Sequence, residues 1–124
     1  MVNKQDYINA INQDIEIVRG DNLAFNFQLS GLESRSAYAA LIVTFAVAEY
    51  YDDQSLFECT NGNGITLEDY DAAKDTATFS VFVAPNKTKT LDLARYYYDL
   101  QIKDNSNVVT LMRGRLTLVY DVAD

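Results

Sequence analysis

The fold of this chain is decided by residues 95–102, which read Arg95-Tyr96-Tyr97-Tyr98-Asp99-Leu100-Gln101-Ile102. Every second side chain from Tyr96 onward is large and apolar, and the side chains between them are mixed in character. This period of two places the two sets on opposite faces of a β-strand. Residues 104–107 favour a tight turn, and residues 108–120 form a second apolar-rich run. The sequence therefore predicts a β-hairpin over residues 95–120.

Other parts of the chain alternate in the same way, or are short apolar runs bounded by turn residues. These predicted strands are residues 15–18, 23–29, 56–59, 65–67 and 76–83. Residues 38–50 are apolar on both sides of the alternation, which favours a strand covered on both faces and leaves a helix as the alternative. No segment has the pattern of a long crossover helix. We therefore expect an all-β fold, an antiparallel β-sandwich of about seven to eight strands.

The first twelve residues differ from the rest of the chain. Tyr7, Ile8 and Ile11 have the spacing of one face of a short helix. A helix this short is marginal alone and gains order by docking on a larger surface. We expect residues 1–12 to form an arm that packs on its own domain or on a neighbouring subunit. The remaining residues, 13–124, are expected to form a single domain.

Length and charge exclude several classes of partner. The chain has 124 residues and a formal net charge of −8, which is enough length for one domain with its own core. An anionic surface is repelled by nucleic acid and by anionic lipid, so neither is expected as a partner. The N-terminus lacks the layout of a signal peptide, and the longest apolar run, residues 37–48, is too short to span a bilayer. These features favour a soluble protein.

Residues suited to catalysis or metal binding are scarce. The chain has no histidine, and its single cysteine, Cys59, is predicted to be a small buried apolar residue. Glu68, Asp69, Asp71 and Asp75 are the best candidates for calcium ligands, but the glycine and the distal glutamate of a calcium loop are missing. A solvated acidic link over residues 68–75 is the better interpretation. We expect no catalytic, cofactor-binding or metal-binding residue, and no enzymatic activity.

The last predicted strand is interrupted by Arg113-Gly114-Arg115. Glycine inside a strand usually marks a bulge or a close approach of another backbone segment. The flanking arginines then share the outward face of the strand. There they are expected to pair with Asp99 or Glu58 across the sheet, or with acidic residues of a neighbouring subunit.

Tyrosines are concentrated at residues 96–98 and at Tyr38, Tyr50 and Tyr51. Alternating tyrosines on a strand pack into the core on one face and form an interface on the other, and a sugar-stacking platform is the alternative. The adhesion tripeptide at residues 19–21, Arg-Gly-Asp, is interpreted as a turn between two strands. The residues expected to contact a partner are Tyr7, Ile8, Ile11, Tyr97, Arg113 and Arg115.

Three pieces of sequence, taken together, carry a family resemblance. Residues 17–21 (Ile-Val-Arg-Gly-Asp) come before the alternating phenylalanines of the second predicted strand. Residues 96–101 follow, and then residues 109–118 with a glycine inside the strand and a closing Asp-Val at residues 121–122. This order resembles the N-terminal domain of siphophage baseplate upper proteins and related small virion proteins of tailed phages. The resemblance covers residues 15–30 and 76–123.

The resemblance implies an immunoglobulin-like β-sandwich that anchors or connects fibres and receptor-binding parts of a virus particle. It implies contact with capsid, portal, tail or fibre subunits, self-association, and location in the virion after synthesis in the bacterial cytoplasm. In the family the sandwich is followed by further domains, whereas this sequence stops at Asp124. The expectation is therefore a connector, collar, head-fibre or decoration component, with a host-surface or glycan-binding module as the alternative. No active residue carries over from the family.

Overall fold

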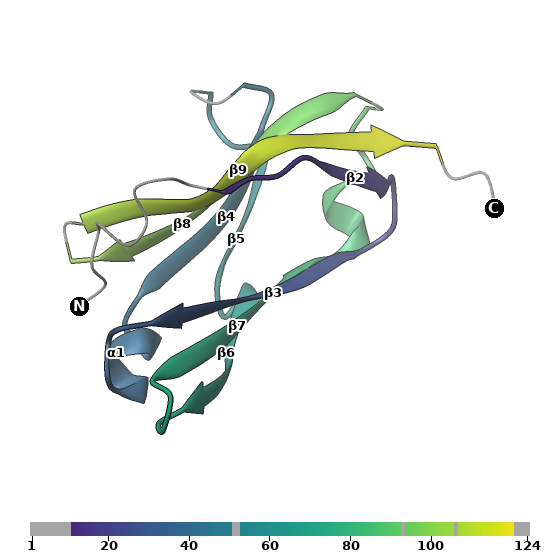
Figure 1. Ribbon diagram of the computed structural model, residues 1–124. Helices are drawn as coiled ribbons and strands as arrows, with labels where there is room; N and C mark the ends of the chain where they lie inside the picture. The colour runs from purple at the N-terminus through teal and green to yellow at the C-terminus, as the bar shows by residue number, and fades with distance from the viewer. Residues whose placement is uncertain (1–10, 51–52, 93, 106, 121–124) are drawn as a thin grey trace.

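The computed structural model describes residues 11–50, 53–92, 94–105 and 107–120. These residues form an all-β structure, as the sequence predicts (Figure 1). The strands are β1 Ile11–Asn12, β2 Ile15–Val18, β3 Leu23–Ser30, β4 Ile42–Ala48, β5 Phe57–Asn61, β6 Gly64–Asp71, β7 Thr76–Val83, β8 Arg95–Asp104 and β9 Asn107–Val119. The helical segments are the α-helix α1 Arg35–Ala39 and the 3₁₀ turn η2 Pro85–Lys87. No helix in the described ranges is both long and apolar enough to cross a membrane.

The strands form one hydrogen-bonded order, β1-β9-β8-β4-β5-β6-β7-β3, in which β2 also pairs with β9. β2 pairs with β9 near one end of this order, and β3 pairs with β7 at the other end. Because only residues 19–22 connect β2 to β3, the sheet curls back on itself into a nearly closed barrel (Figure 1). The prediction of purely antiparallel pairing is wrong for β1 and β2, which run parallel to β9, and for the short pairing of β5 with β6, which is also parallel. The described residues contain nine strands rather than seven or eight. Pairing between strands about a hundred residues apart leaves no local signal in the sequence.

The predicted hairpin of residues 95–120 is confirmed as β8 and β9. Its inward side chains on β8 are at most 6% exposed. They are Tyr96, Tyr98, Leu100 and Ile102. Asn105, in the connecting turn, has a positive φ of 56°, which asparagine tolerates better than most residues.

The core lies inside the curled sheet. β4 contributes Val43, Phe45 and Val47, which are completely buried. The Phe45 ring lies 5.4 Å from the Tyr98 ring and 5.8 Å from the Phe25 ring, which joins strands from opposite sides of the core. Burying each such side chain stabilises the fold by about 1.5–3 kcal/mol.

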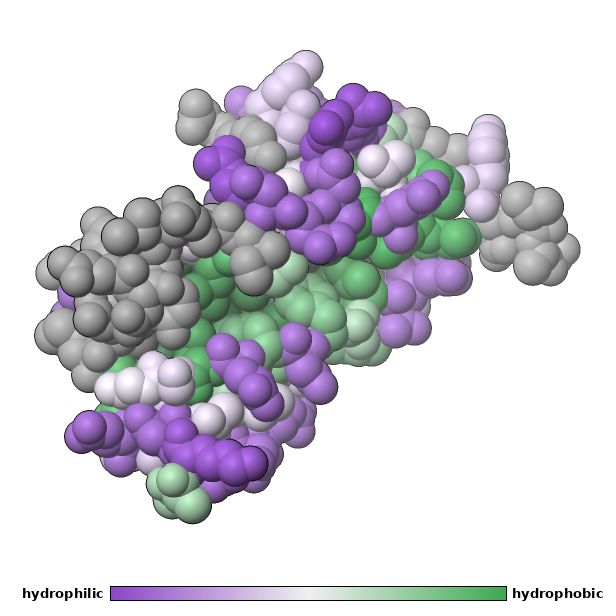
Figure 2. Space-filling view, in the orientation of Figure 1, coloured by the Kyte–Doolittle hydropathy of each residue, from purple (hydrophilic) through white to green (hydrophobic). Residues whose placement is uncertain are grey.

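The core is not fully closed between β2 and β3. Leu23, Phe25 and Phe27 point inward from β3 but remain half-buried, and Ile15 on β2 is half-buried as well. Figure 2 shows apolar surface in this region, between polar surfaces on either side. The two ends of the sheet therefore approach each other without sealing the barrel.

Residues 38–50 do not form one strand, and that prediction is wrong at its start. Ser34 accepts a hydrogen bond from the backbone of Ala37 at 3.2 Å and caps α1, which contains Tyr38. The strand β4 begins only at Ile42. Its outer face is only partly covered, because Ile42 is 54% exposed whereas Ala48 is 8% exposed. A local cap, together with the burial of Tyr38, therefore overrides the apolar alternation at the start of this stretch.

The acidic link predicted at residues 68–75 is also different, because β6 continues to Asp71. Asp75 is not simply solvated. Its carboxylate accepts hydrogen bonds from the hydroxyls of Tyr38 (2.9 Å) and Tyr70 (3.2 Å) and from two backbone amides. Those amides belong to Gly31 and Glu33, both at 2.9 Å. Asp75 thus fastens α1 and the preceding loop to the β6–β7 turn.

The link between β5 and β6 is a tight corner rather than a hairpin. The amide of Thr60 donates to the Asn63 carbonyl at 3.0 Å. The parallel pairing of β5 with β6 comprises two residue pairs, Thr60 with Gly64 and Asn61 with Ile65. Gly64 has a φ of +98°, and a Cβ there would lie 2.8 Å from the Phe82 carbonyl oxygen and 2.9 Å from Cys59 Sγ. The predicted burial of Cys59 is confirmed at 1% exposure.

Gly114 marks a close backbone approach, one of the two predictions for that glycine. A Cβ on Gly114 would overlap the Gln13 carbonyl oxygen, which accepts a hydrogen bond from the Tyr98 hydroxyl. The amide of Arg115 donates to Asp14 Oδ1 at 3.0 Å, just beside this contact. The chain between β1 and β2 is therefore held against β9 at the one position of the strand that has no side chain.

The predicted arm lies mostly outside the described residues, which include neither Tyr7 nor Ile8. The helical spacing does not hold at Ile11, because residues 11–12 form β1 and pair with Met112 and Arg113. This part of the predicted arm belongs to the sheet.

Candidate functional site: a groove on the outer face of the sheet

Three outward side chains of β4, those of Thr44, Ala46 and Ala48, are small, and those on the neighbouring strands are larger. Ala46 pairs with Glu58 on β5 and with Asp99 on β8, so the three residues form one row across the sheet. Adjacent strands lie about 4.8 Å apart, which puts the Glu58 and Asp99 backbones about 10 Å from each other. Ala48 is placed in the same way beside Tyr97. Small residues on the middle strand thus leave a trough between two higher walls.

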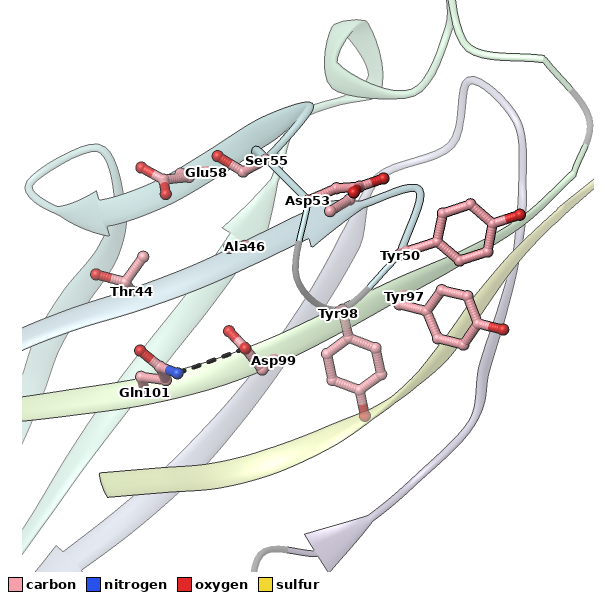
Figure 3. A pocket seen from close by; sticks show the side chains of 11 residues that line it. Thr44, Ala46, Tyr50, Asp53, Ser55, Glu58, Tyr97, Tyr98, Asp99 and Gln101 are labelled. Carbon is pink, nitrogen blue, oxygen red and sulfur yellow. Dashed lines mark hydrogen bonds between the residues drawn. The ribbon is translucent and has the colours of Figure 1, made fainter. Parts of the chain in front are cut away.

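This trough is the outer groove, with a volume of about 350 Å³ (Figure 3). β4, β5 and β8 supply most of its walls, and the segment after β4 supplies the rest. The lining residues are Thr44, Ala46, Ala48, Tyr50, Asp53, Ser55, Glu58, Tyr97, Tyr98, Asp99 and Gln101.

One end of the outer groove is aromatic. The rings of Tyr50 and Tyr97 stack with centroids 6.0 Å apart and planes inclined by 25° (Figure 3). Tyr50 is 65% exposed, which is unusual for a large aromatic side chain. This end therefore offers a ring surface to any molecule that enters the groove.

The middle of the outer groove is acidic. Partial burial raises the pKa of the Asp99 carboxyl, the nearby positive charge of Arg113 lowers it, and the negative charge of Glu58 raises it further. Gln101 Nε2 is 3.5 Å from Asp99 Oδ2 and also donates to Thr110 Oγ1 at 3.4 Å. The net effect leaves an ionised Asp99 less favourable than an ordinary surface aspartate.

The structure separates the residues predicted to contact a partner. Tyr97 lines the outer groove, and Arg113 pairs in register with Asp99 across β8 and β9, as one of the predicted alternatives has it. Arg115 instead lies with its Nε 3.7 Å from Asp14 Oδ2, a partner not considered from the sequence. Tyr7 and Ile8 fall outside the described residues, as does the side chain of Ile11.

Sequence reasoning missed the floor of the groove. Thr44, Ala46 and Ala48 belong to the stretch predicted to be covered on both faces. Their small size is visible in the sequence, but its consequence depends on which residues flank them in the neighbouring strands. Glu58 and Asp99 are 41 positions apart, and only the strand register places them on either side of Ala46.

Comparison with known proteins assigns no family. No protein-family model matches the sequence, and a search of curated proteins found no match. Within the described ranges, no three histidine, cysteine or acidic side chains are grouped so that they could hold a metal ion. The class of the protein is therefore defined by its all-β fold and by the outer groove.

Proposed function

We propose that this chain is an immunoglobulin-like β-sandwich that acts through contacts with other proteins, as a connecting or anchoring component of a tailed-phage virion. The observation that carries the contact role is the outer groove. Its floor is kept clear by small side chains, and it presents an exposed aromatic pair. The resemblance of residues 15–30 and 76–123 to phage virion domains supports the virion assignment.

The strand order of the nearly closed barrel also divides into two groups, as the two layers of a sandwich require. β2, β9, β8, β4 and β5 form one group, and β3, β7 and β6 form the other. Among the described strands, ladder pairing between the two groups is limited to two residue pairs at the β5–β6 corner. In immunoglobulin-like sandwiches the second strand pairs with the fifth in one layer and the sixth pairs with the seventh in the other. Counted from β2, with β5 taken as an added strand beside β4, the β3–β7 and β8–β9 pairs match these two pairings. The half-open seam between β2 and β3 is compatible with two facing layers.

The contact role is tested by particle composition. Purified particles of the phage that encodes the chain should contain it at a fixed ratio to the capsid protein, measured by quantitative mass spectrometry. Replacing both Tyr50 and Tyr97 with alanine should lower that ratio, because the ring surface of the groove is lost. Tyr120→Ala is the matched control, since Tyr120 is 72% exposed and does not line the groove. Absence of the wild-type chain from purified particles would contradict the proposal.

A second candidate function is recognition of a host glycan, favoured by the exposed Tyr50–Tyr97 pair beside polar groove residues. Sugar rings stack on aromatic faces, and their hydroxyls bond to carboxylates and amides. A glycan array probed with the purified protein distinguishes the two functions. Binding that disappears in the double tyrosine variant and persists in Tyr120→Ala would favour the glycan role.

A further inference from the structure

We propose that the outer groove receives the side chain of an arginine or lysine from an extended basic segment of a partner protein. This inference rests on the proposed contact role and names the chemistry of the partner at the same surface. Three features of the groove carry it: its shape at Ala46, its charge and its aromatic end.

The first feature is the gap above Ala46. Glu58 and Asp99 flank this residue in one row, from β5 on one side and β8 on the other. Their backbones are about 10 Å apart, and a charge-assisted N–H···O bond is about 2.8 Å long. A guanidinium or ammonium group above the Ala46 methyl therefore has a carboxylate on each side. Guanidinium suits this place best, because its donors point in several directions within one plane.

The second feature is an excess of negative charge, three carboxylates against one arginine. Asp53, Glu58 and Asp99 line the groove, and Arg113 lies beside Asp99. The negative charge of Glu58 raises the pKa of the Asp99 carboxyl, so an incoming cation relieves a repulsion already present. The whole chain carries a formal net charge of −8, which disfavours a second copy as the occupant. Charge complementarity therefore identifies a different, basic protein.

The third feature is the stacked tyrosine pair. Arginine and lysine stems are apolar and cover ring surface, and their charged ends interact favourably with the face of a tyrosine within about 6 Å of its centre. Tyr50 is 65% exposed and would lose much of that exposure under such a side chain. A neutral sugar would use the rings but would bring no positive charge to the carboxylates of Glu58 and Asp99. The cation accounts for both the acidic middle and the aromatic end of the groove.

The test uses the purified full chain and two short peptides followed by two-dimensional NMR. The probe is acetyl-Gly-Gly-Arg-Gly-Gly-amide, and the control peptide has citrulline, a neutral isostere, in place of arginine. The arginine peptide should shift the backbone amides of Ala46, Tyr97 and Asp99 in a saturable way. The citrulline peptide should leave them in place, because it has the shape of arginine without the charge.

Variants of the protein locate the site. The double variant Glu58→Gln with Asp99→Asn should weaken binding of the arginine peptide about tenfold, as expected for the loss of two ion pairs. Glu16→Gln with Asp21→Asn is the charge-matched control, because both residues are exposed and outside the groove. Ala46→Gln fills the gap without changing the charge and should weaken binding as well. A dispersed NMR spectrum confirms that each variant is folded.

Two results of the NMR experiment would overturn the inference. One is equal shifts with the arginine and citrulline peptides. The other is stronger, saturable shifts of the same amides by a neutral oligosaccharide such as cellotriose, which would make the groove a glycan site.

Particle composition separates this inference from the proposed function. If Glu58→Gln with Asp99→Asn enters particles normally while the double tyrosine variant does not, the cation site is wrong and the contact role stands. If the chain binds the arginine peptide but is absent from particles, the virion role is wrong and the cation site stands.

Discussion

Replacing Gly114 with alanine should destabilise this protein, although alanine is normally the more stable of the two residues in such a position. Gly114 lies in the middle of β9 and is not among the glycines with positive φ, so its backbone suits alanine. Where the native backbone suits alanine, replacing glycine usually stabilises a protein by about 0.4–1 kcal/mol, because alanine reduces the conformational entropy of the unfolded chain. The expected sign is reversed here because Gln13 and Asp14 lie against Gly114.

The magnitude follows from the contacts at Gly114. An added Cβ would overlap the Gln13 carbonyl oxygen and lie 2.8 Å from its carbon and 3.2 Å from Asp14 Oδ1. The first two are backbone atoms, so the whole segment between β1 and β2 must move. Overpacking of this kind costs about 1–3 kcal/mol, and each hydrogen bond lost at Tyr98 and Arg115 adds about 1 kcal/mol. The net destabilisation should be about 3 kcal/mol, which lowers the melting temperature of a domain this size by about 10 °C.

Urea unfolding followed by circular dichroism at pH 7 measures this change. Tyr98→Phe is the matched control, because it removes only the hydroxyl that donates to Gln13 and should cost about 1 kcal/mol. Amide exchange at Arg115 should quicken in Gly114→Ala, since that amide donates to Asp14. If Gly114→Ala is as stable as the wild type or more stable, the close approach of Gln13 to β9 is refuted.

Three further predictions concern ionisable groups. Burial raises the pKa of the Asp75 carboxyl, but four hydrogen bonds outweigh this effect and hold the pKa below its usual value of 3.8. The ionised Asp75 therefore stabilises the folded protein at neutral pH, and this stabilisation is lost as the pH falls below 3.8. Asp75→Asn should therefore lower the urea midpoint at pH 7 and reduce its decline between pH 4 and pH 2, whereas the exposed control Asp21→Asn should change neither. Burial raises the pKa of the Asp99 carboxyl, so its charge opposes folding increasingly as the pH rises above 3.8. Asp99→Asn should melt at the same or a slightly higher temperature than the wild type at pH 7, with the difference gone at pH 2, and a clear loss of stability at pH 7 would contradict this reasoning. Burial also raises the pKa of the Cys59 thiol, which is 1% exposed, so Ellman's reagent should react with it only after unfolding.

The strands were predictable wherever one face of the chain is buried and the other is not. Residues 76–83 and 95–104 alternate clearly, and their inward side chains are buried as that alternation requires. The prediction failed where a local feature competed with the pattern. Ser34 caps a helix that continues into the start of residues 38–50. The hydroxyl of Tyr38 in that helix donates to Asp75, which is 37 residues further along the chain.

The candidate site was predictable only in part. The sequence predicts Tyr97 and Arg113 as contact residues because both are expected to point outward from a strand, and that inference needs only the local period of two. The floor and walls of the outer groove come from β4, β5 and β8, and no local pattern tells which outward side chains are neighbours.

The sequence by itself determined that this protein is built of strands, where most of them lie, and which face of each is buried. These properties depend on residues within a few positions of one another. Tertiary structure alone decided that β1 and β2 run parallel to β9, that Gln13 lies over Gly114, and that Glu58 and Asp99 flank Ala46. The reason is physical: strand pairing joins backbone groups, which are the same in every residue, so the choice of neighbour depends on how all the buried faces pack together at once.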